Sequence, residues 1–229
     1  QIRLADQEVN IGRSKAVALL AYLALAPQPV TRETLLALLW SDYEPQAAQS
    51  QLRQMLWAIQ KAIGKTWLQV DRQSIGFVAQ SALHIDVRLY QQHLQALPAA
   101  PADPARLAGL LAVADLYRDD LLTGFTIGDS AEFAQWQQLE TDAWRHRQMR
   151  VLSEIVTHLT GRQAYMEAIT YARRWLALEP VNEAPHLQLM QLYAYSGQRG
   201  LALRQYQECV QRINAELDAP PSAAITDFY

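Results

Sequence analysis

The chain has 229 residues, half of them hydrophobic and 19% charged, with a formal net charge of −3. This length suits one large domain or two small ones, and the net negative charge does not suggest a nucleic-acid-binding protein. No run approaches the roughly 18 apolar residues of a membrane span, and no signal-peptide pattern opens the chain, so a cytoplasmic protein with no membrane partner is expected.

The single cysteine, Cys209, excludes an internal disulfide and fits a reducing compartment. Because the first residue is Gln1, we expect a fragment of something longer.

Charge is unevenly distributed along the chain. Residues 1–97 hold nine Lys and Arg against seven Asp and Glu, whereas residues 98–229 hold eleven against sixteen. A slightly basic first part followed by an acidic second part indicates two domains with different partners.

The first eighty residues show a recognisable order of elements. Residues 2–11 predict two short strands around a polar turn, and residues 13–26 predict a helix that Pro27 stops. Thr31 is placed to cap a short helix ending near Trp40, and a third helix runs from Pro45 to Gly64. Two β-like runs, 67–72 and 74–79, follow. A strand pair, three helices and a hairpin form the order of a winged helix, a helix-turn-helix followed by a β-hairpin wing.

The predicted third helix separates into two faces. One face is apolar at helical spacing and is expected to be buried: Leu52, Leu56, Ile59 and Ile63, with Ala48 and Met55 beside them. The opposite face carries Ser50, Gln54, Trp57 and Lys61, flanked by Gln51 and Arg53. In a DNA major groove, Gln can pair with adenine and Arg or Lys with guanine. Lys65 after the helix and Arg72 in the wing are placed to meet the phosphate backbone, and Gln73 follows Arg72 at the wing tip.

The rest of the chain is predicted to be helical after a proline-rich loop at 97–105. Helices are expected over 105–122 and 130–159, joined by a turn at 123–129. From Leu152 a 34-residue repeat appears, in which Ala168 matches Ala202 and Ile169 matches Leu203; Ile155 likewise matches Leu189, and Val156 matches Met190. This period is the tetratricopeptide signature, which predicts helix pairs stacked into a solenoid. Within it Trp175, Tyr193 and Tyr206 are expected to pack between helices, and Cys209 to be buried and inert.

The chain resembles a known family over essentially its whole length. Three segments of the first part resemble the OmpR-type winged helix at the front of the Streptomyces antibiotic regulatory protein (SARP) family: RSKAVALLAYLALAP, LLALLW and SQLRQMLWAIQKAIG. Four later segments resemble the bacterial transcriptional activator domain (BTAD) that follows the winged helix in this family: IDVRLYQQHL, LYRDDLLTGF, AEFAQWQQLETDAWRHR and INAELDAPPSAAITDFY. The expected organisation is a mostly α protein, with a winged helix over 1–83 and a tetratricopeptide-like domain over 84–229.

The resemblance implies a DNA-binding transcriptional activator. Its third helix would enter the major groove of double-stranded DNA, and its second domain would support a homodimer or contact RNA polymerase or a further effector domain. Many members carry a P-loop nucleotide-binding domain after this module, but no G-x-x-x-x-G-K-[ST] occurs here, so that domain is absent or lies outside this fragment. Arg53 and Lys61 are the main charges of the third helix, so weak monomeric binding with a shallow salt dependence is expected.

A second hypothesis stays open from the residues themselves. An exposed indole such as Trp57 is more typical of a protein interface than of base contact, which would make the chain a signalling scaffold whose two domains are both protein-interaction modules. Catalysis, a metal and a cofactor are not expected, since only Glu154 and His158 form a helical i, i+4 pair and no third ligand accompanies them.

Overall fold

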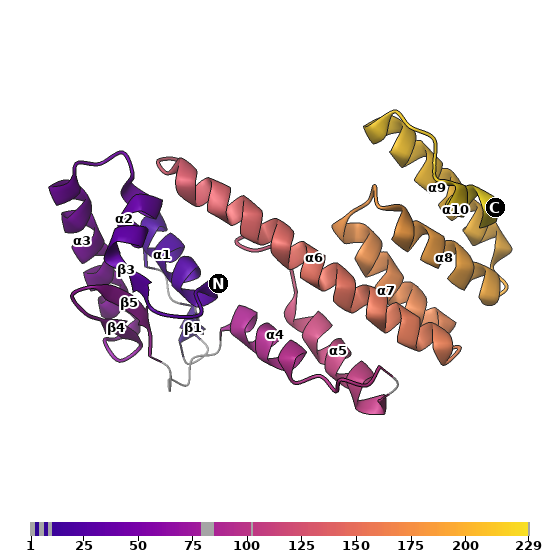
Figure 1. The fold of residues 1–229 in the computed structure, drawn as a ribbon, viewed down its shortest axis with the longest axis horizontal. Helices are drawn as coiled ribbons and strands as arrows, with labels where there is room; N and C mark the ends of the chain where they lie inside the picture. Colours follow the sequence, from indigo (N-terminus) through magenta and orange to yellow (C-terminus); the bar gives the residue numbers. More distant parts are fainter. Residues whose placement is uncertain (1–2, 5–6, 9–10, 79–84, 102, 229) are drawn as a thin grey trace. The chain divides into compact units, whose positions relative to one another are not determined.

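A computed structural model of the chain describes residues 3–4, 7–8, 11–78, 85–101 and 103–228. It is mostly helical and forms two compact units (Figure 1). The first unit comprises residues 1–92 together with 119–142, and the second comprises residues 93–118 and 143–229. The domain boundary predicted between residues 83 and 84 falls in the segment 79–84, which lies outside the described residues.

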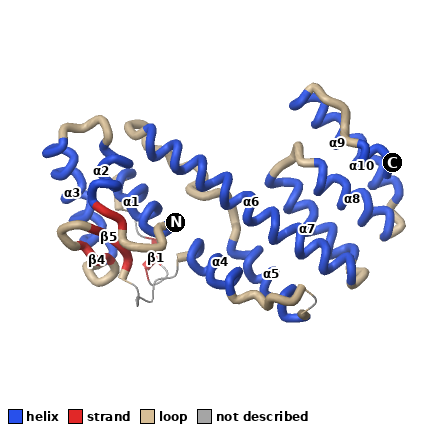
Figure 2. Tube along the Cα trace, in the orientation of Figure 1, coloured by secondary structure: helices blue, strands red, loops and turns tan. Residues whose placement is uncertain are grey.

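The first unit contains a winged helix, as predicted. Strands β1 (Arg3–Leu4) and β2 (Gln7–Glu8) pair antiparallel, and helices α1 (Ser14–Leu25), α2 (Arg32–Trp40) and α3 (Pro45–Ile63) follow. The wing is the hairpin of β4 (Leu68–Val70) and β5 (Ser74–Phe77), coloured red in Figure 2. A further strand, β3 (Val30–Thr31), pairs antiparallel with β5, giving the sheet order β3-β5-β4. This strand was not predicted, because two residues are too short to show an alternating pattern.

Local signals at the helix ends were read correctly. The hydroxyl of Thr31 accepts a hydrogen bond from the backbone N–H of Thr34 at 3.1 Å, which caps α2. Gly64 ends α3 with φ +94°, a conformation that favours glycine, and its N–H donates to the carbonyl of Gln60 at 2.9 Å. The three helices and the wing therefore begin and end where the sequence places them, to within two residues.

The core of the first unit includes a segment from much later in the chain. The side chains of Leu19, Leu39, Leu52 and Ile59 are essentially inaccessible to solvent, and Phe133 is buried in the same cluster. Phe133 belongs to α6 (Ala131–Gly161), whose first twelve residues are part of this unit and whose remainder is part of the second.

The second unit is built from helices alone within the described residues. It contains α5 (Pro104–Leu116), most of α6, α7 (Tyr165–Leu178), α8 (Glu183–Tyr195), α9 (Arg199–Leu217) and α10 (Ala223–Phe228). Helix α4 (Asp86–Gln95), which no sequence pattern indicated, begins in the first unit and ends in the second. The helix predicted over 105–122 ends early: α5 stops at Leu116, residues 119–120 form a bend, and residues 121–124 form a turn.

The predicted tetratricopeptide-like repeat is present in α7 to α9. Ala168 and Ala202 are the fourth residues of α7 and α9, and both are buried, as small residues at a close helix crossing should be. Ile169 is buried but its counterpart Leu203 is 39% exposed, so the end of the array differs from its interior. Trp175 and Tyr193 are buried and Tyr206 is half-buried, as their expected packing between helices requires.

Cys209 has no exposed surface, and burial raises the pKa of its thiol to about 11. A thiol with this pKa is almost entirely protonated at neutral pH, which is the inert state predicted for it.

Candidate nucleic-acid interface

Helix α3 buries the predicted apolar face and exposes the polar one. The six residues expected in the core are all buried: Ala48, Leu52, Met55, Leu56, Ile59 and Ile63. On the other face Arg53, Gln54, Trp57 and Lys61 are exposed, and Ser50 and Gln51 are half-buried. The predicted contact residues of α3 therefore share one solvent-facing surface.

Two of these side chains interact at the C-terminal half of the helix. Trp57 is 63% exposed, and the ammonium nitrogen of Lys61 lies 5.0 Å from the centre of an indole ring of Trp57. This cation–π contact, one helical turn apart, orders both side chains on the surface. An exposed indole and an ammonium group therefore lie together on the solvent-facing side of α3.

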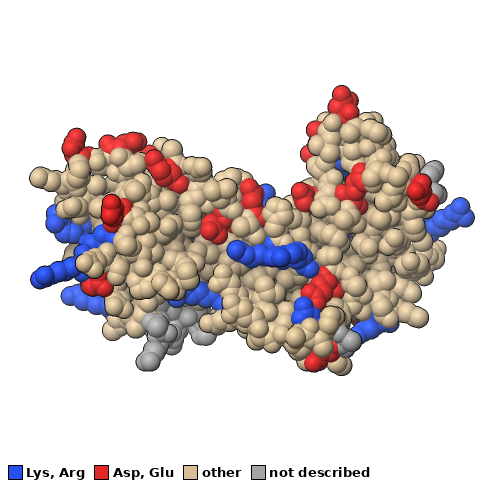
Figure 3. Space-filling view, viewed as in Figure 1, with Lys and Arg blue, Asp and Glu red and all other residues tan. Residues whose placement is uncertain are grey.

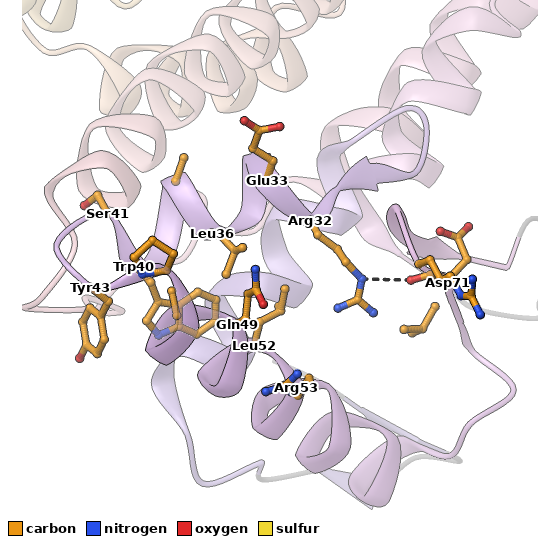
Figure 4. A pocket seen from close by; sticks show the side chains of 15 residues that line it. Arg32, Glu33, Leu36, Trp40, Ser41, Tyr43, Gln49, Leu52, Arg53 and Asp71 are labelled. Carbon is orange, nitrogen blue, oxygen red and sulfur yellow. Dashed lines mark hydrogen bonds between the residues drawn. The ribbon is translucent and has the colours of Figure 1, made fainter.

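A groove of about 850 Å³ opens beside the N-terminal half of α3 (Figure 4). Gln49, Leu52 and Arg53 line it from α3, Arg32 and Glu33 from α2, and Asp71 and Arg72 from the wing. Three arginines from three different elements thus surround one groove. Of the nine predicted site residues, the structure brings Arg53 and Arg72 to this groove. The other seven do not line it: Ser50, Gln51, Gln54, Trp57, Lys61, Lys65 and Gln73.

The wing tip is held together by Asp71. Its carboxylate accepts hydrogen bonds from the backbone N–H groups of Ser74 (2.6 Å) and Gln73 (2.9 Å) and from the Ser74 hydroxyl (3.0 Å). These bonds, led by that of the Ser74 backbone, lower the pKa of Asp71 below its ordinary value of 3.8. The turn that presents Arg72 and Gln73 is therefore held by hydrogen bonds, although Asp71, Arg72 and Gln73 are all exposed.

Arg32 was missed by sequence reasoning, and it joins α2 to the wing. Its guanidinium Nε donates to the backbone carbonyl of Asp71 at 3.0 Å, and its backbone N–H donates to the carbonyl of Gln73 at 2.9 Å. Only the pairing of β3 with β5 brings these residues together. Since β3 gives no sequence signal, nothing in the sequence indicated that Arg32 faces the groove.

Lysine and arginine side chains gather over α3 and the β4–β5 hairpin at one edge of the first unit, while acidic side chains lie over the loop between α2 and α3 (Figure 3). The groove at this edge is lined by the carboxylates of Glu33 and Asp71 as well as by its three arginines, which leaves a formal charge of +1 in its lining.

The loop between α2 and α3 is anchored by a second cluster. The ammonium group of Lys15 forms an ion pair with Asp129 at 2.8 Å and donates to the carbonyl of Leu39 at 2.7 Å. It also lies 5.4 Å from the ring centre of Trp40 and 4.9 Å from that of Tyr43. The hydrogen bond from Lys15 is the largest cause that lowers the pKa of Asp129. The loop is thus fixed from α1 and from the turn before α6.

Within the described residues, no group of three or more His, Cys, Asp or Glu is arranged to hold a metal ion, and no helix is long and apolar enough to cross a membrane. The predicted pair of Glu154 and His158 is present, with 3.6 Å between carboxylate and imidazole, and Glu154 is also ion-paired with Arg106.

Comparison with known proteins gives the family. The family model described as "Bacterial transcriptional activator domain" matches residues 85–229, which is more than half of the chain. The chain belongs to this family of bacterial transcriptional activator domains. The match begins one residue after the start predicted for the second domain, and it does not extend over the winged helix.

One solved structure resembles the activator domain and the winged helix together. The chain aligns over its full length with Mycobacterium tuberculosis EmbR, whose structure was determined in complex with a low-affinity phosphopeptide, at a TM-score of 0.75 and 17% sequence identity. At this identity the likeness shows the fold alone. The alignment covers 61% of the EmbR chain, so this chain spans about three fifths of that length. No curated protein matches the sequence.

The activator domain contributes two pieces to the winged-helix unit. From α4, the guanidinium of Arg88 donates to the carbonyls of Leu23 (3.0 Å), Ala24 (2.9 Å) and Ala26 (3.2 Å) at the end of α1. From residues 119–142, the hydroxyl of Ser130 donates to the carbonyl of Leu38 at 2.6 Å.

The segment 119–142 also adds aromatic contacts and charge to this unit. The rings of Trp136 and Tyr22 lie 5.0 Å apart. The segment holds six acidic and no basic residues, which gives the first unit thirteen Asp and Glu against nine Lys and Arg, and the second ten against eleven. The charge asymmetry read along the sequence is therefore not the asymmetry between the two units, because an acidic segment of the activator domain folds with the winged helix.

Proposed function

We propose that this chain is a DNA-binding transcription regulator of the SARP type, with an OmpR-type winged helix as its DNA-binding domain. The observation that carries the proposal is the convergence of Arg32, Arg53 and Arg72, from α2, α3 and the wing, on one groove beside the exposed face of α3. A surface of this kind matches a duplex, because a helix can lie in the major groove while the flanking basic groups meet phosphates.

Each group then has a role set by its chemistry. Gln51, Arg53 and Gln54 offer amide and guanidinium donors to base edges, since these are the side chains that pair bidentately with adenine and guanine. The phosphate contacts come from Arg32, Lys65 and Arg72, with Gln73 donating from the wing tip, while Ser50 and Lys61 border the base-reading surface. Because so few cations contact the backbone, affinity falls only modestly as salt increases.

The second unit supplies protein contacts in this proposal. Tetratricopeptide-like arrays present a concave surface to a partner, and here that partner is a second copy of the chain, RNA polymerase, or an effector or NTPase domain. A homodimer would place two α3 helices on a repeated site, which raises affinity beyond that of one weakly charged helix.

The test is selection from a pool of random DNA duplexes at low salt, followed by sequencing of the retained fraction. We expect enrichment of a motif, in the form of a direct repeat if the chain binds as a dimer. Arg53→Ala should weaken binding to the selected duplex about tenfold, as loss of one bidentate base contact does. Its melting temperature should not change, because Arg53 is exposed. Arg162→Ala, at an exposed arginine after α6, serves as the control and should bind as the unaltered chain does.

A second function is favoured by Trp57 alone. An indole that is 63% exposed and ordered by Lys61 is a typical anchor for a protein partner, which would make the winged helix an interaction module in a signalling scaffold. If no motif is enriched even at low salt, the DNA-binding proposal is wrong. Loss of a captured protein partner in Trp57→Ala would then support the scaffold.

A further inference from the structure

A second groove lies entirely within the tetratricopeptide-like unit. It has a volume of about 400 Å³ between α7, α8 and α9, and its accessible apolar lining includes Leu176, Ala177 and Leu201. Three arginines also line it: Arg173 from α7, and Arg204 and Arg212 from α9. An apolar groove of this size accommodates a few side chains of a ligand, and the arginines decide which ligand.

The three guanidinium groups keep their charge available. Arg173 donates from Nε (3.2 Å) and Nη2 (2.8 Å) to the phenol oxygen of Tyr193, a neutral acceptor that orients the guanidinium without neutralising it. Among the described residues none of the three arginines is in an ion pair. Glu208 is the single acidic residue in the lining, so the groove carries a formal charge of +2.

The two arginines of α9 are spaced to act together. Arg204 and Arg212 are eight residues apart, which places them on one side of the helix about 12 Å apart along its axis. Arg173 faces them from α7 across the groove. A ligand that satisfies all three must therefore carry more than one negative charge and extend along the groove.

We infer that this groove binds an acidic peptide segment of a partner protein, in which Asp or Glu side chains flank an apolar residue. The carboxylates pair with the guanidinium groups, whose planar fork matches a carboxylate bidentately, and the apolar side chain covers the leucine floor. The inference deepens the proposed function by giving the chemistry of the protein partner, and it rests on that function for the partner's biological role.

Nucleic acid fits the same groove poorly. Single-stranded nucleic acid binds by stacking its bases on exposed aromatic rings along a charged track. Tyr193, the aromatic residue in this lining, is 4% exposed and offers no face for stacking. A nucleic acid would also leave the leucine floor uncovered, whereas an acidic peptide with an apolar residue fills both parts of the groove.

The experiment uses the full chain and a random peptide library displayed on phage. Selection is performed in parallel on the unaltered chain, on the double variant Arg204→Gln/Arg212→Gln, and on Arg199→Gln, an exposed arginine of the same helix outside the groove. Peptides from the first selection are synthesised and their affinities measured by fluorescence anisotropy for all three proteins. Binding of each protein to oligo(dT) is measured in the same way.

We expect the selected peptides to combine Asp or Glu with an apolar residue. Their affinity should fall at least about tenfold in the double variant and stay unchanged in Arg199→Gln, since each lost guanidinium removes a charge-assisted hydrogen bond. Replacing the peptide's acidic residues with their amides should cause a similar loss. The affinity of the double variant for the duplex selected in the test of the proposed function should equal that of the unaltered chain, so a failure of peptide binding can be told apart from a failure of DNA binding.

Three results would overturn the inference. The first is selection of no peptide, or of peptides without acidic residues. The second is equal binding of the selected peptides by the double variant and by Arg199→Gln. The third is binding of oligo(dT), and of no peptide, that depends on Arg204 and Arg212. None of them bears on whether α3 binds a duplex.

Discussion

At the scale of single residues, Arg88 shows how the activator domain stabilises the winged helix. The last carbonyls of a helix have no partner within it, and at the end of α1 three carbonyl oxygens receive hydrogen bonds from the one guanidinium of Arg88. The positive charge also lies at the negative end of the helix dipole. Burial lowers the pKa of Arg88, so this charge is held in a partly desolvated site.

We therefore predict that Arg88→Ala lowers the free energy of unfolding by about 2–3 kcal/mol. Hydrogen bonds from a charged group and the interaction of a positive charge with the C-terminal end of a helix together contribute about this much. Urea unfolding followed by circular dichroism measures the change. Arg162→Ala is the matched control and should remain within about 0.5 kcal/mol of the unaltered chain, since its side chain is exposed. Equal stabilities of the two variants would show that Arg88 does not stabilise the end of α1.

At the scale of elements, α8 and α9 are connected through a buried histidine. His186 in α8 has no exposed surface; its Nε2 lies 3.0 Å from the carbonyl of Pro180, and its Nδ1 lies 2.7 Å from Nε2 of Gln205 in α9. Burial is the main cause that lowers the pKa of His186 below its ordinary value of 6.5; Arg212 lowers it further, while the Pro180 carbonyl, Glu208 and Glu183 oppose the shift.

This pKa predicts a loss of stability in mild acid. The unfolded chain takes up a proton at His186 near pH 6.5, whereas the folded chain does so only at lower pH, so the stabilisation is complete above pH 6.5 and is lost as the pH falls below it. Between pH 7.5 and 5.5 the loss is at most about 1.4 kcal/mol. His186→Gln, whose amide can make the same two hydrogen bonds without titrating, should remove this part of the pH dependence in urea unfolding. His93→Gln, on the exposed side of α4, should retain it.

The elements themselves were largely predictable from the sequence. The faces of α3, the caps at Thr31 and Gly64, and the repeat that pairs Ala168 with Ala202 all depend on residues close in sequence or on a fixed period. By contrast β3 and the place of Arg32 in the groove depend on pairing between residues distant in sequence. Local patterns carry no information about such contacts, which is why Arg32 was missed.

At the scale of the whole molecule, the winged helix and the activator domain do not fold as two consecutive pieces of sequence. Phe133 of α6 is fully buried in the same cluster as the three winged-helix helices. Its neighbours Ser130 and Trp136 contact Leu38 and Tyr22. The DNA-binding surface proposed here is therefore supported by a segment of the activator domain.

Truncating Phe133 tests this dependence. We predict that Phe133→Ala lowers the free energy of unfolding by about 3–5 kcal/mol, as loss of a buried phenyl ring does, and weakens duplex binding in proportion to the unfolded fraction at the assay temperature. Leu139→Ala, two turns later on α6 and 63% exposed, should leave both unchanged. A fragment of residues 1–92 that folded with the stability of the first unit in the full chain would contradict this prediction.

The insertion of residues 119–142 into the first unit has a consequence for the protein during its synthesis. A nascent chain leaves the ribosome at about 5–20 residues per second, and consecutive domains usually fold in the order in which they emerge. Here helices α1 to α3 emerge with their core still lacking Phe133, which follows about seventy residues after the end of α3, some 3–14 seconds later. Until then an apolar face of the nascent winged helix remains uncovered and open to chaperones. A protein built in this way acquires the complete core beneath its proposed DNA-binding surface only once residues 119–142 of the activator domain have been translated.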